Sequence, residues 1–255
     1  MINPTHQSEE KRRGNGQYAI RSNVQSSTMT GQHLTTIPLF EGLSPKERKR
    51  IVGALRQKTF KAGDIVFHEG DPGDKLFLVR QGLVRIYTGG REKGFETSVI
   101  LIGKSGDVFG ELAIVDGKPR SASAKAMEDT IVYTIANHHF KHHLECIPQL
   151  AINFIQQMSN KMRSNTRKIN DLASKPVVSR LAILIAKLAE EHGVKDDAQT
   201  VINISLNQTQ IASMIGATRE STNRAMQQLK QKEIVMKDDG RLRVLNFKEL
   251  LSLTD

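Results

Sequence analysis

The segment Gly106-Asp-Val-Phe-Gly-Glu-Leu-Ala-Ile-Val-Asp-Gly-Lys-Pro-Arg-Ser-Ala-Ser-Ala124 decides the fold of the N-terminal half of this chain. It places Gly110 and Glu111 a short loop ahead of Arg120, Ser121 and Ser123. A bound phosphate requires a cation and nearby N–H donors, and a sugar hydroxyl requires an acceptor such as a carboxylate. The segment therefore predicts a nucleotide pocket between two strand-like runs.

The residues around this segment form short β-branched or aromatic runs, separated by turn signals such as Gly70-Asp-Pro-Gly73. Short strands at this spacing indicate a β-sandwich or roll of antiparallel strands. We expect them over 64–67, 76–79, 83–87, 98–102, 121–126 and 130–135. Ahead of them, Ser44-Pro-Lys-Glu47 combines an N-cap, a proline at N1 and a capping-box acid. It predicts a short helix to about Leu55.

After Pro148 the apolar residues change to the period of a coiled coil. Steps of four and three alternate through Ala151, Ile155, Met158, Met162, Asn165, Ile169 and Leu172, which predicts a helix to about Ala173. Ser174-Lys-Pro176 interrupts it. We expect a parallel dimer with Ile155, Met158, Met162, Asn165 and Ile169 in the seam. The alternative is a helix that packs on its own domain.

A second compact unit begins at Val177. A helix to His192, an acidic loop over 195–200 and a strand over 201–204 precede Asn207-Gln-Thr-Gln210, which has the pattern of a helix N-terminus. That helix ends at a glycine turn, and Thr218 caps a second helix that runs to about Lys232. Two short helices joined by a glycine turn predict a helix-turn-helix.

The second helix divides into two faces at about 100° per residue. The polar face holds Arg219, Glu220, Asn223, Arg224 and Gln227, and the other holds Thr222, Ala225, Met226 and Leu229. Arginine can donate twice to guanine, and glutamate can accept from cytosine N4. The run 234–245 reads as a hairpin with an Asp-Gly turn, so we expect a winged helix-turn-helix that binds double-stranded DNA.

Length, charge and cysteine content narrow the class of protein. The 255 residues suffice for two modest domains, and the net charge of +10 indicates an acidic partner such as nucleic acid. The only cysteine, Cys146, excludes an intrachain disulfide and a multi-cysteine iron–sulfur or zinc site. No run approaches the roughly 20 apolar residues of a membrane span. We therefore expect a cytoplasmic protein with no membrane contact, and a disordered polar tail over 1–33.

Three motifs occur in an order that resembles the CRP/FNR family of bacterial transcription regulators. They are Gly70-Asp-Pro-Gly-Asp-Lys-Leu-Phe-Leu-Val-Arg-Gln-Gly82, the 110–121 cassette and Gly216-Ala-Thr-Arg-Glu-Ser-Thr-Asn-Arg224. The resemblance covers about residues 37–248. It implies an α+β fold with a cyclic-nucleotide-binding β-roll (a double-stranded β-helix, or jelly roll), a long dimerisation helix and a C-terminal winged helix-turn-helix. The domains would span 37–148, 149–175 and 176–255.

The resemblance also implies roles for individual residues. In the cAMP-responsive branch, Gly110 and Glu111 would hold the ribose, with Leu112 beside them, and Arg120 and Ser121 would hold the cyclic phosphate. Asn165 and Thr166 match positions that contact the base, the second from the partner subunit. Arg219, Glu220 and Arg224 match the trio that reads a TGTGA-like half-site, with Asn223 and Thr218 adjacent. The bacterial cAMP receptor has threonine where this chain has Asn165, which leaves the base open.

Together these features predict a homodimeric transcription regulator gated by a cyclic nucleotide, with cAMP preferred and RNA polymerase as a further partner. One alternative is an orphan regulator that binds DNA without cyclic nucleotide, or with another ligand such as cGMP. Another is an enzyme or a metal-binding protein that uses His138, His139, His142 and His143, which pair at i, i+4. No nucleophile–base pair or carboxylate dyad favours catalysis, so we assign no catalytic residue and no metal. We expect Cys146 to be buried and inert.

Overall fold

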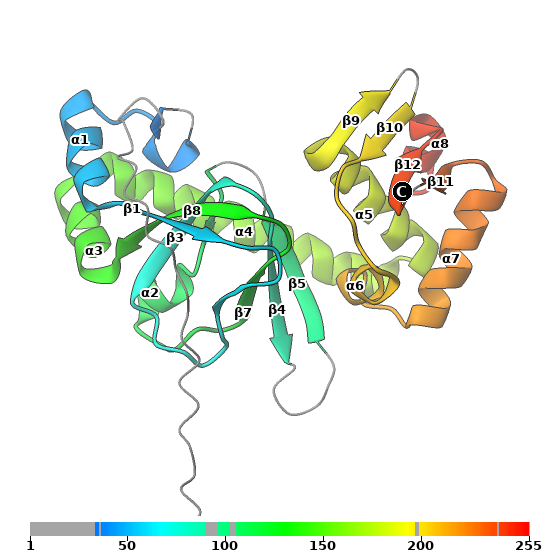
Figure 1. Ribbon diagram of the computed structural model, residues 1–255, viewed down its shortest axis with the longest axis horizontal. Helices are drawn as coiled ribbons and strands as arrows, with labels where there is room; N and C mark the ends of the chain where they lie inside the picture. Colours follow the sequence, from blue (N-terminus) through cyan, green and yellow to red (C-terminus); the bar gives the residue numbers. More distant parts are fainter. Residues whose placement is uncertain are drawn as a thin grey trace, which may run out of the picture.

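The computed structural model describes residues 34, 35, 37–89, 96–102, 106–196, 199–238 and 240–254. Two compact units lie at opposite ends of a long helix, α4 (Pro148–Ser174), which runs from one to the other (Figure 1). The N-terminal unit is a β-roll with helices at one end, and the C-terminal unit combines helices with a small sheet. The expected α+β fold is confirmed. The tail expected over 1–33 lies outside the described residues.

The roll consists of two four-stranded antiparallel sheets. One has the order β1-β8-β3-β6 and the other β2-β7-β4-β5. The strands are β1 (Arg56–Phe60), β2 (Ile65–Phe67), β3 (Lys75–Gln81), β4 (Val84–Gly89), β5 (Glu96–Ile102), β6 (Val108–Phe109), β7 (Ser123–Ala126) and β8 (Thr130–Ala136). A cluster that includes Phe60, Val79 and Val132 is buried with them. Burial of this apolar surface is the main force that holds the two sheets together.

Two strands of the roll, β1 and β6, were missing from the sequence expectation. In β1 only Phe60 is both apolar and buried, so the strand shows no alternation of apolar and polar residues. Its place depends on pairing with β8, from Arg56 opposite Thr134 to Phe60 opposite Thr130. β6 contains two residues, too few for any period to be visible.

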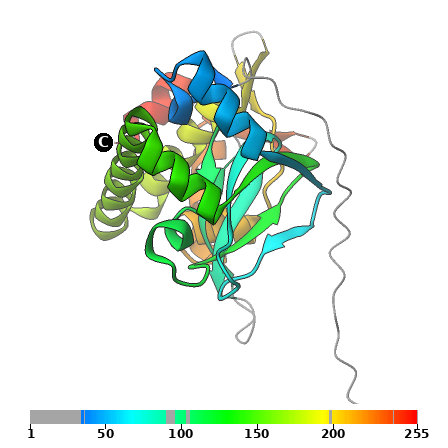
Figure 2. The ribbon, with the colours of Figure 1, turned by 90° about the vertical axis from the view of Figure 1, so that its left-hand side faces the viewer.

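Helices cover one end of the roll, as Figure 2 shows. They are the 3-10 helix η2 (Pro38–Phe40), α1 (Pro45–Ala54), α3 (Asn137–Cys146) and the start of α4. The capping box predicted at Ser44 is present, because its side chain accepts from the Glu47 N–H and Glu47 accepts from the Ser44 N–H. The expectation of a buried Cys146 is wrong: its thiol is exposed at the end of α3, where it turns away from the apolar cluster.

The long helix α4 begins at Pro148 and ends at Ser174, close to the predicted bounds. Its first turns pack on the roll through Leu150 and Phe154, and Asn153 donates to the Leu39 and Glu41 carbonyl oxygens. Beyond this region, large apolar side chains of α4 are exposed, among them Met162 and Ile169. Within the described residues, no helix has the length and apolar character that crossing a membrane requires.

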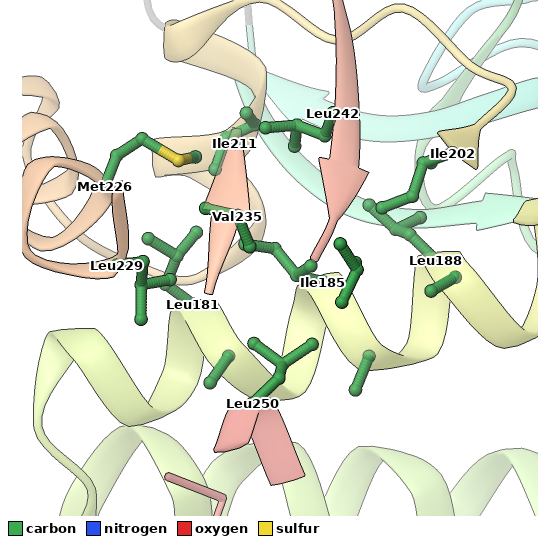
Figure 3. Close-up of a cluster of buried hydrophobic side chains, with 14 of the residues drawn as sticks. Leu181, Ile185, Leu188, Ile202, Ile211, Met226, Leu229, Val235, Leu242 and Leu250 are labelled. Atoms are coloured by element: carbon green, nitrogen blue, oxygen red, sulfur yellow. The ribbon is translucent and has the colours of Figure 1, made fainter. Parts of the chain in front are cut away.

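The C-terminal unit contains α5 (Val177–His192), α6 (Gln208–Met214), α7 (Arg219–Gln231) and α8 (Phe247–Ser252). Its sheet has the order β11-β12-β10-β9, from β9 (Gly193–Asp196), β10 (Gln199–Ile202), β11 (Val235–Asp238) and β12 (Arg241–Val244). Figure 3 shows Leu181 and Ile185 of α5 directed into one cluster with Leu229 of α7 and Leu250 of α8. This shared core holds the helix-turn-helix and the wing as one body.

Two details of this unit differ from the sequence expectation. The stretch predicted as an acidic loop over 195–200 contributes β9, which pairs with β10 from Gly193 opposite Ile202 to Asp196 opposite Gln199. Val194, Lys195 and Asp196 are all exposed, so no buried face appears in the sequence. α8 was not anticipated; Asn246 caps it by accepting from the Glu249 N–H at 3.0 Å.

The two units also touch each other. α6 lies against β5 of the roll (Figure 1). Leu83, at the base of the β4–β5 hairpin, belongs to the same apolar cluster as the C-terminal core, and Met127 packs against that cluster. The C-terminal unit is thus held by α4 and by a direct apolar contact with the roll.

Candidate functional site

A cavity of about 560 Å³ lies between the roll and α4. Its walls come from the turn between β6 and α2 (Leu112–Asp116), the residues just before β7, the middle of α4 and the end of α5. Small-molecule pockets commonly measure about 300–1,000 Å³. Most of the expected ligand-binding residues line it: Gly110, Glu111, Leu112, Arg120, Ser121 and Asn165. The fold therefore gathers these side chains from two distant parts of the sequence around one space.

Gly110 closes β6 in a conformation that favours glycine, with a φ of 75°. A Cβ atom at this position would lie 2.6 Å from Nη1 of Arg120. That distance is too short for two non-bonded atoms, so any larger residue would displace the guanidinium. The glycine is required both by its own backbone and by the position of Arg120.

Arg120 is the buried cation of the cavity, with 4% of its surface exposed. Its Nη1 donates to the Gly110 carbonyl oxygen and its Nη2 to the Lys75 carbonyl oxygen, each at 2.7 Å. The guanidinium carbon lies 4.5 Å from the centre of the Phe67 ring. Nε is buried and makes no hydrogen bond within the described residues. The protein thus orients the guanidinium with two of its five N–H groups, and Nε is a further donor without a partner in the described residues.

The charge of Arg120 has little solvent to stabilise it. Burial, the largest cause, lowers the pKa of Arg120, and the nearby carboxylates of Asp74, Asp71 and Glu111 act in the opposite direction. An anion that bound at the guanidinium would favour the charged form and could accept from its unused N–H groups. This end of the cavity is therefore suited to a phosphate oxygen.

Glu111 has a partner that sequence reasoning missed. The Nζ atom of Lys161 on α4 lies 2.9 Å from Oε1 of Glu111 and donates to the Val108 carbonyl oxygen at 2.6 Å. The side chains of the pair are 12% exposed for Glu111 and 33% for Lys161. One signal pointed to Lys161: it precedes Asn165 by four residues, so both lie on the same face of the helix. The ion pair connects the 110–121 cassette to α4.

The hydroxyls of the segment have different surroundings. Ser121 is exposed and lines the cavity. Ser123 is buried, and its Oγ accepts from the Glu69 N–H at 2.9 Å, so it stabilises the roll. Ser123 is not part of the cavity wall, contrary to the grouping in the sequence. Ser121 lies in the bend that precedes β7, whereas Ser123 is the first residue of the strand and its hydroxyl is held by the Glu69 N–H.

Asn165 and Thr166 differ in the same way. Asn165 lines the cavity, whereas Thr166 is exposed and its Oγ1 donates to the Met162 carbonyl oxygen at 3.1 Å. Adjacent residues on a helix point about 100° apart, and Thr166 is not among the described residues that line the cavity. The expectation that Thr166 serves the pocket of a partner subunit is compatible with this position and stays a prediction.

The seam residues expected on α4 show an apolar stripe. Ile155 is 63% exposed, Met162 71% and Ile169 64%. Met158 instead packs partly against the core of the roll. The exposed residues follow one another at intervals of seven, the heptad repeat of a coiled-coil interface.

The helix-turn-helix presents the polar face that the sequence predicted. Thr222, Ala225, Met226 and Leu229 of α7 are buried, whereas Arg219, Glu220, Asn223, Arg224 and Gln227 are exposed. Thr218 caps α7, since its side chain accepts from the Ser221 N–H at 3.1 Å. The division of α7 into two faces is confirmed, and its exposed N-terminal turns are free to approach a DNA groove.

The wing is stabilised by one arginine. Arg243 of β12 lies 2.6 Å from an Asp196 oxygen on β9 and 3.5 Å from an Asp238 oxygen on β11. These carboxylates raise the pKa of Arg243. Lys237 and Arg241 remain exposed at the hairpin, where they can meet phosphate groups.

The histidine cluster gathers few ligands. In the part of the chain that the structure describes, no group of three or more His, Cys, Asp or Glu side chains is placed to hold a metal ion. The Cys146 sulfur lies 3.7 Å from Nε2 of His142 on the surface of α3. These side chains carry no site comparable with the cavity above.

Two family models match the chain. Residues 57–145 match the cyclic nucleotide-binding domain, and residues 179–253 match the Crp-like helix-turn-helix domain. The first match contains the 110–121 cassette, and the second contains the recognition helix α7. Both halves of the sequence interpretation are therefore represented, in the expected order.

Curated proteins of similar sequence match most of this chain. A CRP-like cAMP-activated global transcriptional regulator of Mycobacterium tuberculosis is 28% identical over 214 residues, 80% of this chain and 94% of the relative. The cyclic AMP receptor protein of Thermus thermophilus is 27% identical over 210 residues, 81% of this chain and 92% of the relative.

Solved structures with a similar fold extend over most of this chain. A CRP/FNR family transcriptional regulator from Thermus thermophilus has a TM-score of 0.67 and 25% identity, covering 78% of this chain and 98% of its own. FixK2 from Bradyrhizobium japonicum has a TM-score of 0.68 over 79% of this chain and 98% of its own, with 19% identity. The latter likeness concerns the fold.

Proposed function

We propose that this chain, a member of the CRP/FNR family of transcription regulators, is a homodimer whose binding to a palindromic DNA site is gated by a cyclic nucleotide, with cAMP preferred. The family membership and the two domains establish a cyclic-nucleotide-binding, DNA-binding regulator. The identity of the nucleotide, the dimer and the DNA site are the proposed parts. Each has its own support in the side chains.

The phosphate end of the cavity carries the proposal. Arg120 is buried, oriented by two backbone carbonyls, and keeps Nε without a hydrogen-bond partner within the described residues. Glu111 stands at the same cavity with an oxygen available for a ribose hydroxyl. A cyclic nucleotide offers both groups at once. Neither side chain is paired with a nucleophile, so the site is suited to holding a phosphate ester rather than cleaving it.

The proposed dimer buries the apolar stripe of α4. Exposed patches of this kind usually mark an interface, and the seven-residue spacing of Ile155, Met162 and Ile169 suits a parallel coiled coil. In that arrangement Thr166 would reach the pocket of the partner. A nucleotide in either pocket would then contact both subunits.

The proposed gating uses the continuity of α4. This helix lines the cavity at Lys161 and Asn165 and ends at Ser174, within the stretch Asp171–Pro176 that we propose as the hinge. Lys175 also donates to the Thr254 carbonyl oxygen at 2.6 Å, which ties the hinge to the end of the chain. A ligand that favours one packing of the two α4 helices would favour one position of the DNA-binding units.

The DNA-reading part relies on the exposed face of α7. Arg219, Glu220 and Arg224 would read a TGTGA-like half-site, with Asn223 and Thr218 beside them. Two copies would occupy major grooves about 34 Å apart on one side of the duplex. We infer RNA polymerase as a further partner, as for a transcription regulator in general.

Calorimetric titration of the full chain with cAMP and cGMP in parallel, with and without a palindromic TGTGA duplex, tests the proposal. We expect tighter binding of cAMP than of cGMP, and tighter DNA binding when cAMP is present. If neither nucleotide binds while the free protein already binds the duplex tightly, the gating fails and the chain is an orphan regulator. Tighter binding of cGMP would retain the gating and change the ligand.

A further inference from the structure

One carboxylate in the wall of the nucleotide cavity comes from the DNA-binding unit. Glu191 lies in the last turn of α5, within the span that matches the helix-turn-helix family model. The other described lining residues belong to the roll or to α4. The cavity therefore has a direct contact with the DNA-binding unit of its own chain, in addition to the indirect connection along α4.

A neighbouring cavity shows at which end Glu191 lies. A second space of about 330 Å³ lies among α4, α5 and α6. The residues common to the two cavities are Ser164, Asn165 and Glu191, so these three mark the boundary between them. Arg120 and Ser121 line the first cavity alone. Glu191 is thus placed with Asn165, and away from the phosphate end at Arg120.

The surroundings of Glu191 leave its oxygens accessible. Its side chain is 43% exposed, and Nζ of its ion-pair partner, Lys187 in the preceding turn, lies 4.0 Å from its Oε1. A carboxylate has about four acceptor positions, and this single long contact leaves most of them available. The complementary ligand group is an N–H donor. Adenine and guanine each carry an exocyclic amino group that donates, and the ribose and phosphate are accounted for elsewhere in the cavity.

Given the proposed function, on which this inference depends, we propose that Glu191 accepts a hydrogen bond from the exocyclic amino group of the bound purine and thereby couples the ligand to the DNA-binding unit. The contact exists only while α5 stands at the cavity. A ligand that makes it binds this arrangement of the two units more tightly than any arrangement in which α5 has moved away. By linkage, the ligand stabilises the position of α5 to the same extent.

The test compares two proteins and two ligands. Glu191→Ala removes the acceptor, and Glu190→Ala removes the same charge from an exposed neighbour that lines neither cavity. Both changes suit a helix, because alanine has the highest helix propensity. The ligands are cAMP and the 3′,5′-cyclic monophosphate of purine riboside, which lacks the amino group. Calorimetry on the full chain measures each dissociation constant.

We expect Glu191→Ala to weaken cAMP binding about tenfold, the lower end for a hydrogen bond to a charged group. The amino-free analogue should bind wild type and Glu191→Ala alike, and Glu190→Ala should behave as wild type. Equal losses for both ligands, or no loss for cAMP, would overturn the proposal. If the wild type binds neither cAMP nor cGMP, the proposed function itself fails. If the wild type and Glu191→Ala both bind cAMP equally well, only the role of Glu191 fails.

Hydrogen exchange provides a readout that a purely local contact would not change. In the wild type, cAMP should slow exchange of the backbone amides in the last turns of α5, because the ligand holds α5 at the cavity. In Glu191→Ala saturated with cAMP, that protection should be lost. Equal protection in the two proteins would show that α5 is held by other means and would overturn the coupling.

Discussion

Replacing Arg120 with methionine tests the phosphate end of the cavity. Methionine keeps a long apolar side chain that can lie on the Phe67 ring, and it removes the charge and every donor. The Gly110 and Lys75 carbonyl oxygens lose their hydrogen bonds, and a bound nucleotide loses the charge and the unused N–H donors of the guanidinium. The same change therefore perturbs stability and binding, by amounts that the contacts allow us to separate.

The effect on stability should be moderate. Two hydrogen bonds from a charged donor contribute about 1.5–3 kcal/mol each, which sets an upper limit of about 6 kcal/mol. Two facts reduce the loss. Gly110 borders an open cavity where water can replace the donor, and burial already disfavours the charged guanidinium, as the lowered pKa of Arg120 shows. We expect the free energy of unfolding to fall by about 1–2 kcal/mol, less than the 5–15 kcal/mol typical of a domain.

Arg120→Met should remove a larger fraction of the free energy of nucleotide binding than of the free energy of unfolding. The phosphate loses a charge-assisted hydrogen bond and the nearest buried cation, so we expect cAMP affinity to fall at least about 30-fold, or ~2 kcal/mol. Urea unfolding and calorimetry on the same preparations measure the two quantities. Arg80→Met is the control, because Arg80 is exposed on β3 and donates to Gln57 at 3.0 Å. A folded Arg120→Met protein that bound cAMP within about threefold of wild type would refute the assignment of Arg120.

Three further changes test other parts of the molecule. Met162→Glu should dissociate the dimer in sedimentation experiments, since two methionines that each contribute about 1.5–3 kcal/mol on burial are replaced by charges; an intact dimer would place the interface elsewhere. Arg219→Ala should reduce the discrimination at one base pair by ~1–3 kcal/mol of DNA-binding free energy, whereas Lys237→Ala should lower the affinity for all DNA sequences alike. If Arg219→Ala also lowered the affinity for all sequences alike, Arg219 would be a phosphate contact. Burial, followed by neighbouring charges, lowers the pKa of His143 from 6.5. The unfolded state therefore binds that proton more tightly, and the free energy of unfolding should fall as the pH drops below about 6.5. His143→Gln should flatten this dependence in unfolding curves and His138→Gln should not; equal curves would exclude His143 as the cause.

Local features were predictable because their physical causes lie within a few residues. The capping boxes at Ser44 and Asn207 involve residues three positions apart. The two faces of α7 follow from the helical period alone. The same holds for the heptad spacing on α4. For these elements, the side chains that stabilise the structure are neighbours in the sequence.

Elements stabilised from a distance were missed or misjudged. β1 forms because it pairs with β8, and the two strands lie at opposite ends of the sequence of the roll. We expected Cys146 to be buried because it is small and precedes Ile147. Its side chain is exposed because of the direction in which it points at the end of α3. Ser123 is buried because it belongs to β7 and accepts from the Glu69 N–H, although the motif groups it with Ser121, which lies outside the strand.

The sequence by itself determined the two domains, their order and the chemistry of the nucleotide cassette, since a cation, a carboxylate and a glycine turn occur together within 106–124. Only the tertiary structure decided which distant groups complete the cavity. Lys161 reaches Glu111 from α4, and Glu191 reaches the cavity from α5. No periodic pattern in the sequence indicates either contact, because both depend on how the roll, α4 and the DNA-binding unit pack against one another.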